Sequence, residues 1–269
     1  MRAPLRYYPV ALIGSEFSFA HGPLRFTALT SVDIRRIPYM TKKVAILQSS
    51  YIPWKGYFDL INLVDEFILF DDVQYTRADW RNRNRIKTRH GLMWLTIPVS
   101  LKGKFHQPIK ETKIVDPSWV SEHWRSLVSH YTKAPYFREY AEAFRQVYEQ
   151  STEASLSLIN HRFITTICDL VGITTKITWS MDYEIVDGKT RRLVELCRQA
   201  GATDYLTGPS AQAYIEPELF EAANIGLHYM DYSGYPEYVQ LYPPFEHQVS
   251  VLDLLFCTGP QVRQYMKSF

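Results

Sequence analysis

Residues 43–72 read KVAILQSSYIPWKGYFDLINLVDEFILFDD, and this stretch decides the expected fold. A short apolar run at 44–47 leads into a turn that contains Pro53 and Gly56. An amphipathic segment over 56–64 follows, and a second apolar run at 67–70 ends in two carboxylates. The order of strand, turn, helix and strand is typical of a parallel βαβ unit.

Polar side chains gather where the two expected strands end. Gln48 and Tyr51 follow the first strand, and Asp71 and Asp72 follow the second. Six cationic side chains stand shortly beyond, between residues 77 and 89. Since open parallel sheets bind ligands at the carboxyl ends of their strands, we expect a site at this edge of the sheet.

The rest of the chain predicts an α/β fold with an open, mostly parallel sheet, a β-hairpin and a helical insertion between its halves. The turn Arg89-His90-Gly91 divides the two arms of the hairpin. The elements expected from apolar periodicity and from Gly and Pro positions are hairpin strands at 85–88 and 93–99, a short strand at 113–115, helices over 118–132, 137–149 and 154–171, strands at 176–179, 204–206 and 226–230, and helices over 190–200, 217–223 and 249–256.

Composition bounds the class of protein. With 269 residues, of which 46% are hydrophobic, the chain can bury a full core. Thirty Lys and Arg against 28 Asp and Glu give a net charge of +2, which disfavours a nucleic-acid partner without excluding one. The three cysteines are far apart and predict no disulfide framework, and no apolar run approaches the ~20 residues of a membrane span. We therefore expect a cytoplasmic protein.

Residues 1–39 differ from the remainder. They lack strong periodicity and the apolar core of a signal peptide. We predict a weakly ordered N-terminal extension over 1–39 that carries no chemistry, and a single α/β domain over 40–269.

The run WRNRNRIKTR at 80–89 concentrates positive charge. If it is extended, its period of two places Arg81, Arg83, Arg85, Lys87 and Arg89 on one face, where they could hold phosphate oxygens. The alternative is a charged edge strand that prevents aggregation.

Three further features could bind a phosphorylated ligand. Asp71 and Asp72 could hold Mg²⁺ beside a nucleotide phosphate, or could cap a turn. The turn at 51–57 ends where a helix begins, and Gly56 could let an anion approach the main chain, or could serve turn shape alone. Gly208 and Ser210 follow a strand in the same way, although Ser210 could be a helix N-cap and nothing more. The histidines show no metal-ligand spacing.

The run ILQSSYIPWKGYFD at 46–59 resembles the opening of the WbqC-like family. The segments FDDVQY at 70–75, WRNRNRIK at 80–87, APYF at 134–137, YLTG at 205–208 and SVLDLLF at 250–256 are similar to it as well. The resemblance covers residues 42–269. Two departures are Ser49-Ser50, where Pro-Asn or Pro-Ser is commoner, and Cys257, where Asn is commoner, so no polar role is assigned to position 257.

The genes of this family resemble members of surface-polysaccharide (O-antigen) clusters. The resemblance therefore implies a transferase or ligase that moves an aminoacyl (glycyl-type) or acyl group to an amino sugar, using a nucleotide or nucleotide-linked sugar. The βαβ start also resembles, more weakly, that of nucleotidyltransferases. WKGY at 54–57 stands where nucleotidyltransferases have a His-x-Gly-His turn. Both histidines are absent here, so that catalytic role is not carried over.

The alternatives are a nucleic-acid (base or tRNA) modifying enzyme and a non-catalytic nucleotide- or sugar-binding scaffold. Under the transferase hypothesis, a nucleotide with Mg²⁺ is the expected cofactor, with Asp71 and Asp72 as metal ligands. The expected catalytic residues are Gln48, Tyr51, Asp71 and Asp72, and the expected substrate- or phosphate-binding residues are Gly56, Tyr57, Arg77, Trp80, Arg81, Asn82, Arg83, Lys87, Gly208 and Ser210.

Overall fold

The computed structural model describes residues 41–104 and 106–269. The predicted extension over residues 1–39 lies outside the described residues. The division of the chain into an extension and one domain therefore stays a prediction.

One parallel sheet organises the described residues, and its order is β5-β2-β1-β6-β7. Every neighbouring pair runs parallel, and Leu47 of β1 stands beside Leu69 of β2. β1 lies in the middle of the sheet. The next two strands in the chain, β2 and β5, lie on one side of β1, and the last two, β6 and β7, lie on its other side. The five strands are β1 (Lys43–Leu47), β2 (Glu66–Leu69), β5 (Lys176–Trp179), β6 (Asp204–Thr207) and β7 (Gly226–Tyr229).

Alternating side chains of the central strands enter two separate cores. Ala45 and Phe67 belong to the larger core, whereas Val44, Ile46 and Ile68 belong to the smaller one. Because successive strand residues point to opposite faces, the sheet is covered on both sides. The larger core receives α1 (Lys55–Asn62) and α4 (Leu156–Val171), and the smaller receives α5 (Lys189–Gln199) and α6 (Pro217–Ala222).

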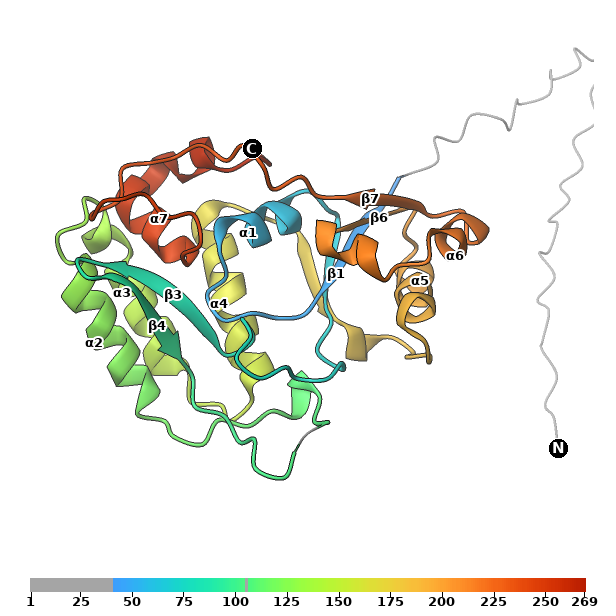
Figure 1. Ribbon diagram of the computed structural model, residues 1–269, viewed down its shortest axis with the longest axis horizontal. Helices are drawn as coiled ribbons and strands as arrows, with labels where there is room; N and C mark the ends of the chain where they lie inside the picture. Colours follow the sequence, from blue (N-terminus) through green and yellow to red (C-terminus); the bar gives the residue numbers. More distant parts are fainter. Residues whose placement is uncertain (1–40, 105) are drawn as a thin grey trace, which may run out of the picture. The chain divides into compact units, whose positions relative to one another are not determined.

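The predicted insertion lies between β2 and β5. It contains the antiparallel hairpin and three helices. The last of them, α4, is capped by Gly172, which has a φ of 83°, as predicted from a glycine C-cap. The hairpin lies against the start of α7, since the Ser250 amide donates to Arg85 O at 2.8 Å (Figure 1). The remaining elements are β3 (Arg83–Thr88), β4 (Gly91–Thr96), α2 (Trp119–Tyr131), α3 (Phe137–Gln150) and α7 (Val251–Thr258), with 3₁₀ turns at Ile109–Glu111, Ser180–Asp182, Pro209–Ala213 and Gly259–Tyr265.

The predicted fold class is confirmed, but one predicted strand is absent and the bounds of several others differ by one to three residues. The strand predicted at 113–115 is wrong, because Lys113 and Ile114 make only isolated bridges, to Ser155 and Val99. The second hairpin strand ends at Thr96 rather than at 99. Pro98 follows, and it has no amide hydrogen with which to extend the pairing. None of the helices within 41–104 and 106–269 has the length and apolar character needed to cross a membrane.

Candidate functional site

The turn after β1 contains a strained residue. Ile52 has a φ of 37°, which β-branched residues rarely adopt. Asn84 Nδ2 donates to Ile52 O at 2.9 Å and to Tyr51 O at 3.1 Å, and the Tyr51 amide donates to Trp80 O at 3.1 Å. Strain of this kind persists only where the surroundings fix it, and it concentrates at functional sites. The hairpin thus holds the turn in place.

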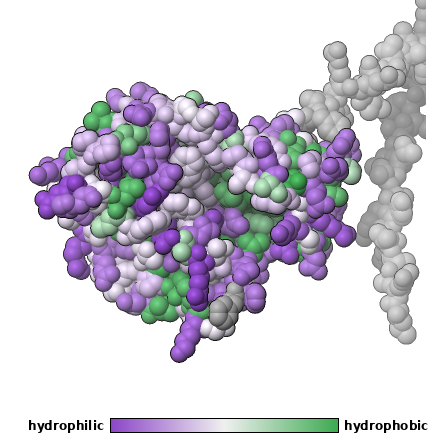
Figure 2. Space-filling model, in the orientation of Figure 1, coloured by the Kyte–Doolittle hydropathy of each residue, from purple (hydrophilic) through white to green (hydrophobic). Residues whose placement is uncertain are grey.

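A cavity of about 790 Å³ opens beside this turn. Its size is within the range of small-molecule sites, and Figure 2 shows the same face hollowed, with pale and apolar residues in the recess. Aromatic rings supply much of its wall. The lining consists of Leu47, Pro53, Trp54, Tyr57, Trp80, Tyr232 and Tyr235, of the polar residues Ser50, Arg81, Asn84, Ser210, His247 and Gln248, and of Gly208, Pro209 and Gly234.

The cavity lies at the point where the sheet reverses its order. β1 is flanked by β2, which follows it in sequence, and by β6, which enters from the second half of the chain. Leu47 and Ser50 follow or end β1, and Gly208 and Ser210 follow β6, and all four line the cavity. A crevice at the carboxyl ends of the strands beside such a switch point is the usual ligand site of open parallel sheets.

Arg81 has a fixed position in this crevice. Its guanidinium donates to the carbonyl oxygens of Gln48 at 3.0 Å and Ser49 at 3.2 Å, and its Nε lies 3.5 Å from Asp79 Oδ2. Tyr57 donates its hydroxyl to the same Gln48 oxygen at 3.0 Å. The structure therefore brings together the predicted residues Tyr57 and Arg81 around the main chain of Gln48, whose carbonyl oxygen makes these contacts.

Gly56 fits the second of its two predicted roles, which concerns the shape of the turn. A Cβ at this position would lie 2.4 Å from the indole of Trp54, so the missing side chain makes room for that ring. The Trp54 ring also lies edge-on to Tyr232 and Tyr235, with centroids 5.1 and 5.6 Å away. The first turn of α1 therefore bears an aromatic wall of the cavity.

The two carboxylates after β2 have different partners. Asp71 is buried and accepts from the Ser49 amide at 2.8 Å and from the Ser157 hydroxyl. Burial raises the pKa of Asp71, and the hydrogen bonds from Ser157 and Ser49 oppose that shift. Asp72 accepts from Ser180 and lies 3.4 Å from Arg192.

This separation of partners bears on the predicted Mg²⁺ site. The part of the chain that the structure describes contains no group of three or more His, Cys, Asp or Glu residues able to hold a metal ion. Mg²⁺ bound by Asp71 and Asp72 together with substrate oxygens therefore stays a prediction.

Tyr51 lies in the core, away from the cavity. It is fully buried, and its hydroxyl hydrogen-bonds with Tyr148 at 2.6 Å and with His123 Nδ1 at 2.9 Å. Burial raises the pKa of Tyr51 and lowers that of His123 to about 4, so both groups stay neutral near pH 7. These contacts make Tyr51 a packing residue between the turn after β1 and the helical insertion.

The other predicted residues divide between the cavity and its surroundings. Trp80, Gly208 and Ser210 line the cavity. Asn82 fixes the base of the hairpin, where it donates to Ile97 O at 2.7 Å. The remaining three lie outside the cavity lining. Arg83 donates to Ala78 O and stacks on Trp94, and Lys87 is buried and donates to the carbonyl oxygen of Pro244. Arg77 donates to Leu101 O at 3.3 Å beside a separate hollow.

Sequence reasoning missed the wall that comes from residues 232–248. This segment contributes Tyr232, Tyr235 and His247 to the cavity, although it contains no helix or strand. Asp59 of α1 anchors it, because Tyr235 donates its hydroxyl to Asp59 Oδ2 at 2.5 Å. The sequence does carry a signal for this wall, because the segment is long, rich in aromatic residues and without secondary structure. Long loops of this kind in compact domains are often functional.

Lys55 was also missed. It lies behind this wall, where its Nζ donates to Pro236 O at 3.0 Å and stands 4.7 Å from the centroid of the Tyr235 ring. Burial lowers the pKa of Lys55 to about 8, against an opposing effect of Asp59. The aromatic wall thus rests on a buried amine.

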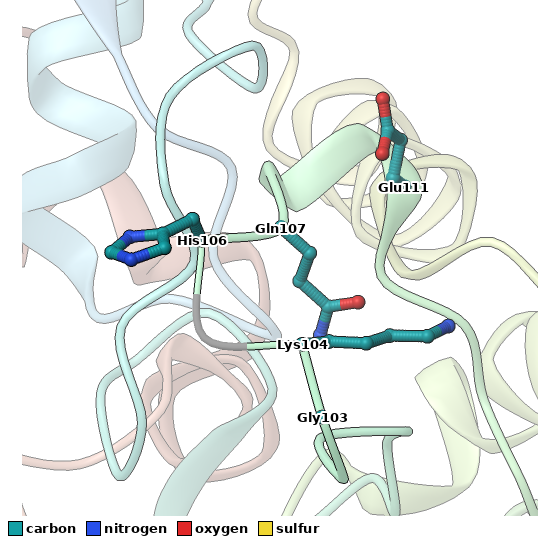
Figure 3. A pocket seen from close by; sticks show the side chains of 5 residues that line it. All are labelled: Gly103, Lys104, His106, Gln107 and Glu111. Atoms are coloured by element: carbon teal, nitrogen blue, oxygen red, sulfur yellow. The ribbon is translucent and has the colours of Figure 1, made fainter.

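A second hollow of about 530 Å³ lies along the loop at 103–111. Figure 3 shows that its side chains diverge: His106 points to one side, Lys104 to the other, and Glu111 away from both. Because His106, Lys104 and Glu111 point in different directions, the cavity beside β1 and β6 is the better candidate site.

The profile of the WbqC-like protein family matches residues 48–265. The chain belongs to this family. It is similar to the uncharacterized protein Rv1507c of Mycobacterium tuberculosis, with 51% identity over 226 residues, which cover 84% of this chain and 98% of that protein. No solved structure matches the chain.

The WbqC-like match contains nearly the whole candidate site. Every cavity residue except Leu47 falls within the matched range, including the late segment with Tyr232 and His247. The family assignment therefore extends to the cavity and to the hairpin beside it.

Proposed function

We propose that this WbqC-like protein is a biosynthetic transferase of surface-glycan assembly, which moves a small acyl or aminoacyl group to an amino sugar held in the cavity. One observation carries the proposal: an aromatic-walled cavity of about 790 Å³ lies at the switch point between β1 and β6. Aromatic rings can pack on the apolar faces of a sugar, and a few polar groups suffice to fix its orientation.

The polar lining supports acyl-transfer chemistry. In this reaction the sugar amine attacks the acyl carbonyl carbon, an amide bond forms, and the bond to the activating group breaks. His247 lines the cavity and could take the proton from the attacking amine. The released proton could then pass to the leaving group.

Fixed donors could bind the developing oxyanion. Arg81 is held by the two carbonyl oxygens of Gln48 and Ser49, so its guanidinium is oriented before any substrate enters. Tyr232 adds a hydroxyl to the same cavity, and burial raises its pKa to about 12, so the hydroxyl stays protonated at neutral pH. Preorganised donors of this kind contribute most where water is excluded.

The test uses nucleotide-linked amino sugars and their counterparts with a hydroxyl in place of the amine. We expect a thermal shift with the amino sugars, and an amide product detectable by mass spectrometry when a glycyl or acetyl thioester is added. His247→Gln should remove the product while the thermal shift persists, because binding does not need the base. His130→Gln is the matched control, since His130 lies on α2 outside the cavity lining.

Two results would contradict the proposal. One is binding of the amino sugar with no product from any activated acyl donor, which would favour a non-catalytic scaffold. The other is tight binding of tRNA or DNA that weakens steeply between 50 and 200 mM salt, which would favour the nucleic-acid alternative.

A further inference from the structure

The outward face of the hairpin combines two tryptophans with two arginines. Arg85 stands directly opposite Trp94 in the register of β3 and β4. The Arg83 guanidinium lies 4.2 Å from the centroid of the Trp94 ring, and that of Arg85 lies 5.3 Å from Trp94 and 5.5 Å from Trp80. The two indole rings are 5.4 Å apart. We call Trp80, Arg83, Arg85 and Trp94 the hairpin face.

Folding does not require large aromatic rings on this side of the hairpin. The inward side supplies the core, where Ile86 and Leu95 are buried. Trp80 and Trp94 keep 39% and 43% of their surface exposed, whereas Trp119 is buried. Two adjacent exposed indoles flanked by arginines form an apolar patch with a polar rim, which is typical of a ligand-binding or partner-binding surface.

Among the residues that the structure describes, the arginines of the hairpin face have no acidic partner. Arg83 donates to the carbonyl oxygen of Ala78, and Arg85 donates to the side-chain oxygen of Gln248 at 2.6 Å. Within residues 41–104 and 106–269, no carboxylate pairs with either. Their charges are therefore available to an anion, although the whole chain is almost neutral.

The hairpin face continues into the cavity. Trp80 belongs to both, and Gln248, which accepts from Arg85, also lines the cavity. Arg81, which stands between Trp80 and Arg83 in the sequence, also lines the cavity. One ligand can therefore occupy both surfaces, and this continuity favours an extended small molecule over a protein partner.

We propose that the hairpin face is a subsite for the nucleoside diphosphate part of a nucleotide-linked substrate. The base stacks on the exposed indoles, and the diphosphate meets Arg83 and Arg85. The sugar then enters the cavity. This assignment rests on the proposed function above, and it identifies the acceptor as a sugar that is still attached to its nucleotide.

The test is calorimetric titration of the full chain with four probes: UDP, ADP, uridine and inorganic pyrophosphate. We expect the two nucleoside diphosphates to bind more tightly than either uridine or pyrophosphate. Trp94→Leu and Arg85→Gln should each weaken the diphosphates at least tenfold, which is about 1.4 kcal/mol. Arg89→Gln removes one charge from the hairpin turn and should change affinity less than twofold.

Folding is checked by thermal melting, and Trp94→Phe is the second variant, since it keeps an aromatic ring and should keep most of the affinity. The subsite would be overturned if wild type bound neither UDP nor ADP. It would also be overturned if Trp94→Leu and Arg85→Gln bound them as tightly as wild type does. A change of oligomeric state in Trp94→Leu without loss of nucleotide affinity would also overturn it, in favour of a protein interface.

The two proposals fail separately. If amide formation on amino sugars persists in Trp94→Leu at saturating substrate while UDP affinity is unaffected, the subsite is wrong and the transferase stands. If UDP binding requires Trp94 and Arg85 but no amide forms, the subsite stands and the transferase is wrong.

Discussion

Asn84 Nδ2 donates to the carbonyl oxygen of Ile52 at 2.9 Å, and this bond ties strand β3 to the strained turn after β1. Both residues are buried. The same amide also reaches Tyr51 O, so one side chain satisfies two main-chain acceptors that the turn leaves without strand partners. The shape of the cavity edge therefore depends on a residue of the hairpin.

Replacing Asn84 by Asp tests this dependence. The carboxylate would face two carbonyl oxygens without a hydrogen to donate, so we expect a loss of about 1–3 kcal/mol in the free energy of unfolding. Affinity for UDP-glucosamine should fall as well, because a shift of the turn would move Ser50 and Trp54, which line the cavity. Urea denaturation measures the first effect, with exposed Gln264→Ala as the control. A loss below about 0.5 kcal/mol would show that the turn holds itself.

Gly56 and Gly208 should respond differently to replacement by alanine. At Gly56 a Cβ would meet the Trp54 ring at 2.4 Å, whereas at Gly208 the nearest atom, on Tyr232, is 3.9 Å away. Gly56→Ala should therefore destabilise the protein by about 1–3 kcal/mol through overpacking, and Gly208→Ala should stay within about 0.5 kcal/mol. Equal thermal melting of both variants would show that the Trp54 ring is not fixed on α1.

The acid stability of the protein should depend on Glu66. Burial alone raises the pKa of Glu66, but hydrogen bonds from Lys42, Tyr183, Thr178 and Lys176 outweigh it and lower the pKa to about 2. A depressed folded pKa stabilises the protein above the unfolded value of about 4.5, and this contribution is lost as the pH falls from there towards 2.

Glu66→Gln is the matched variant for this effect. The difference in unfolding free energy between wild type and variant should be largest above pH 5 and should shrink steadily below pH 4.5. Urea titrations between pH 3 and 7 measure it. A difference that does not change with pH would mean that the glutamate contributes through its shape alone.

The sequence predicted the sheet and most of its helices because local apolar runs and Gly or Pro boundaries determine them. The strand at 44–47 and the helix cap at Gly172 are examples. The strand expected at 113–115 did not form, because its neighbours in space offer single bridges rather than a continuous edge.

The candidate site was predicted less completely. Trp80, Arg81 and Ser210 line the cavity as parts of motifs that were visible in the sequence. The sequence predicts Tyr51 and Lys87 as site residues, but helices and the segment at 232–248 bury them. Contacts between residues about 150 positions apart, such as Lys87 with Pro244, leave no signature in a local pattern.

The central claim is that the crevice between β1 and β6 holds the sugar. Ser210→Trp tests it most directly, because Ser210 is exposed at the cavity and a tryptophan there should fill the space without disturbing the core. Ser121→Trp on α2 is the control, since Ser121 is exposed outside the cavity lining. We predict that calorimetric titration with UDP-glucosamine gives at least tenfold weaker binding for Ser210→Trp than for wild type and Ser121→Trp, at equal melting temperatures. Equal affinity in all three proteins would contradict the claim.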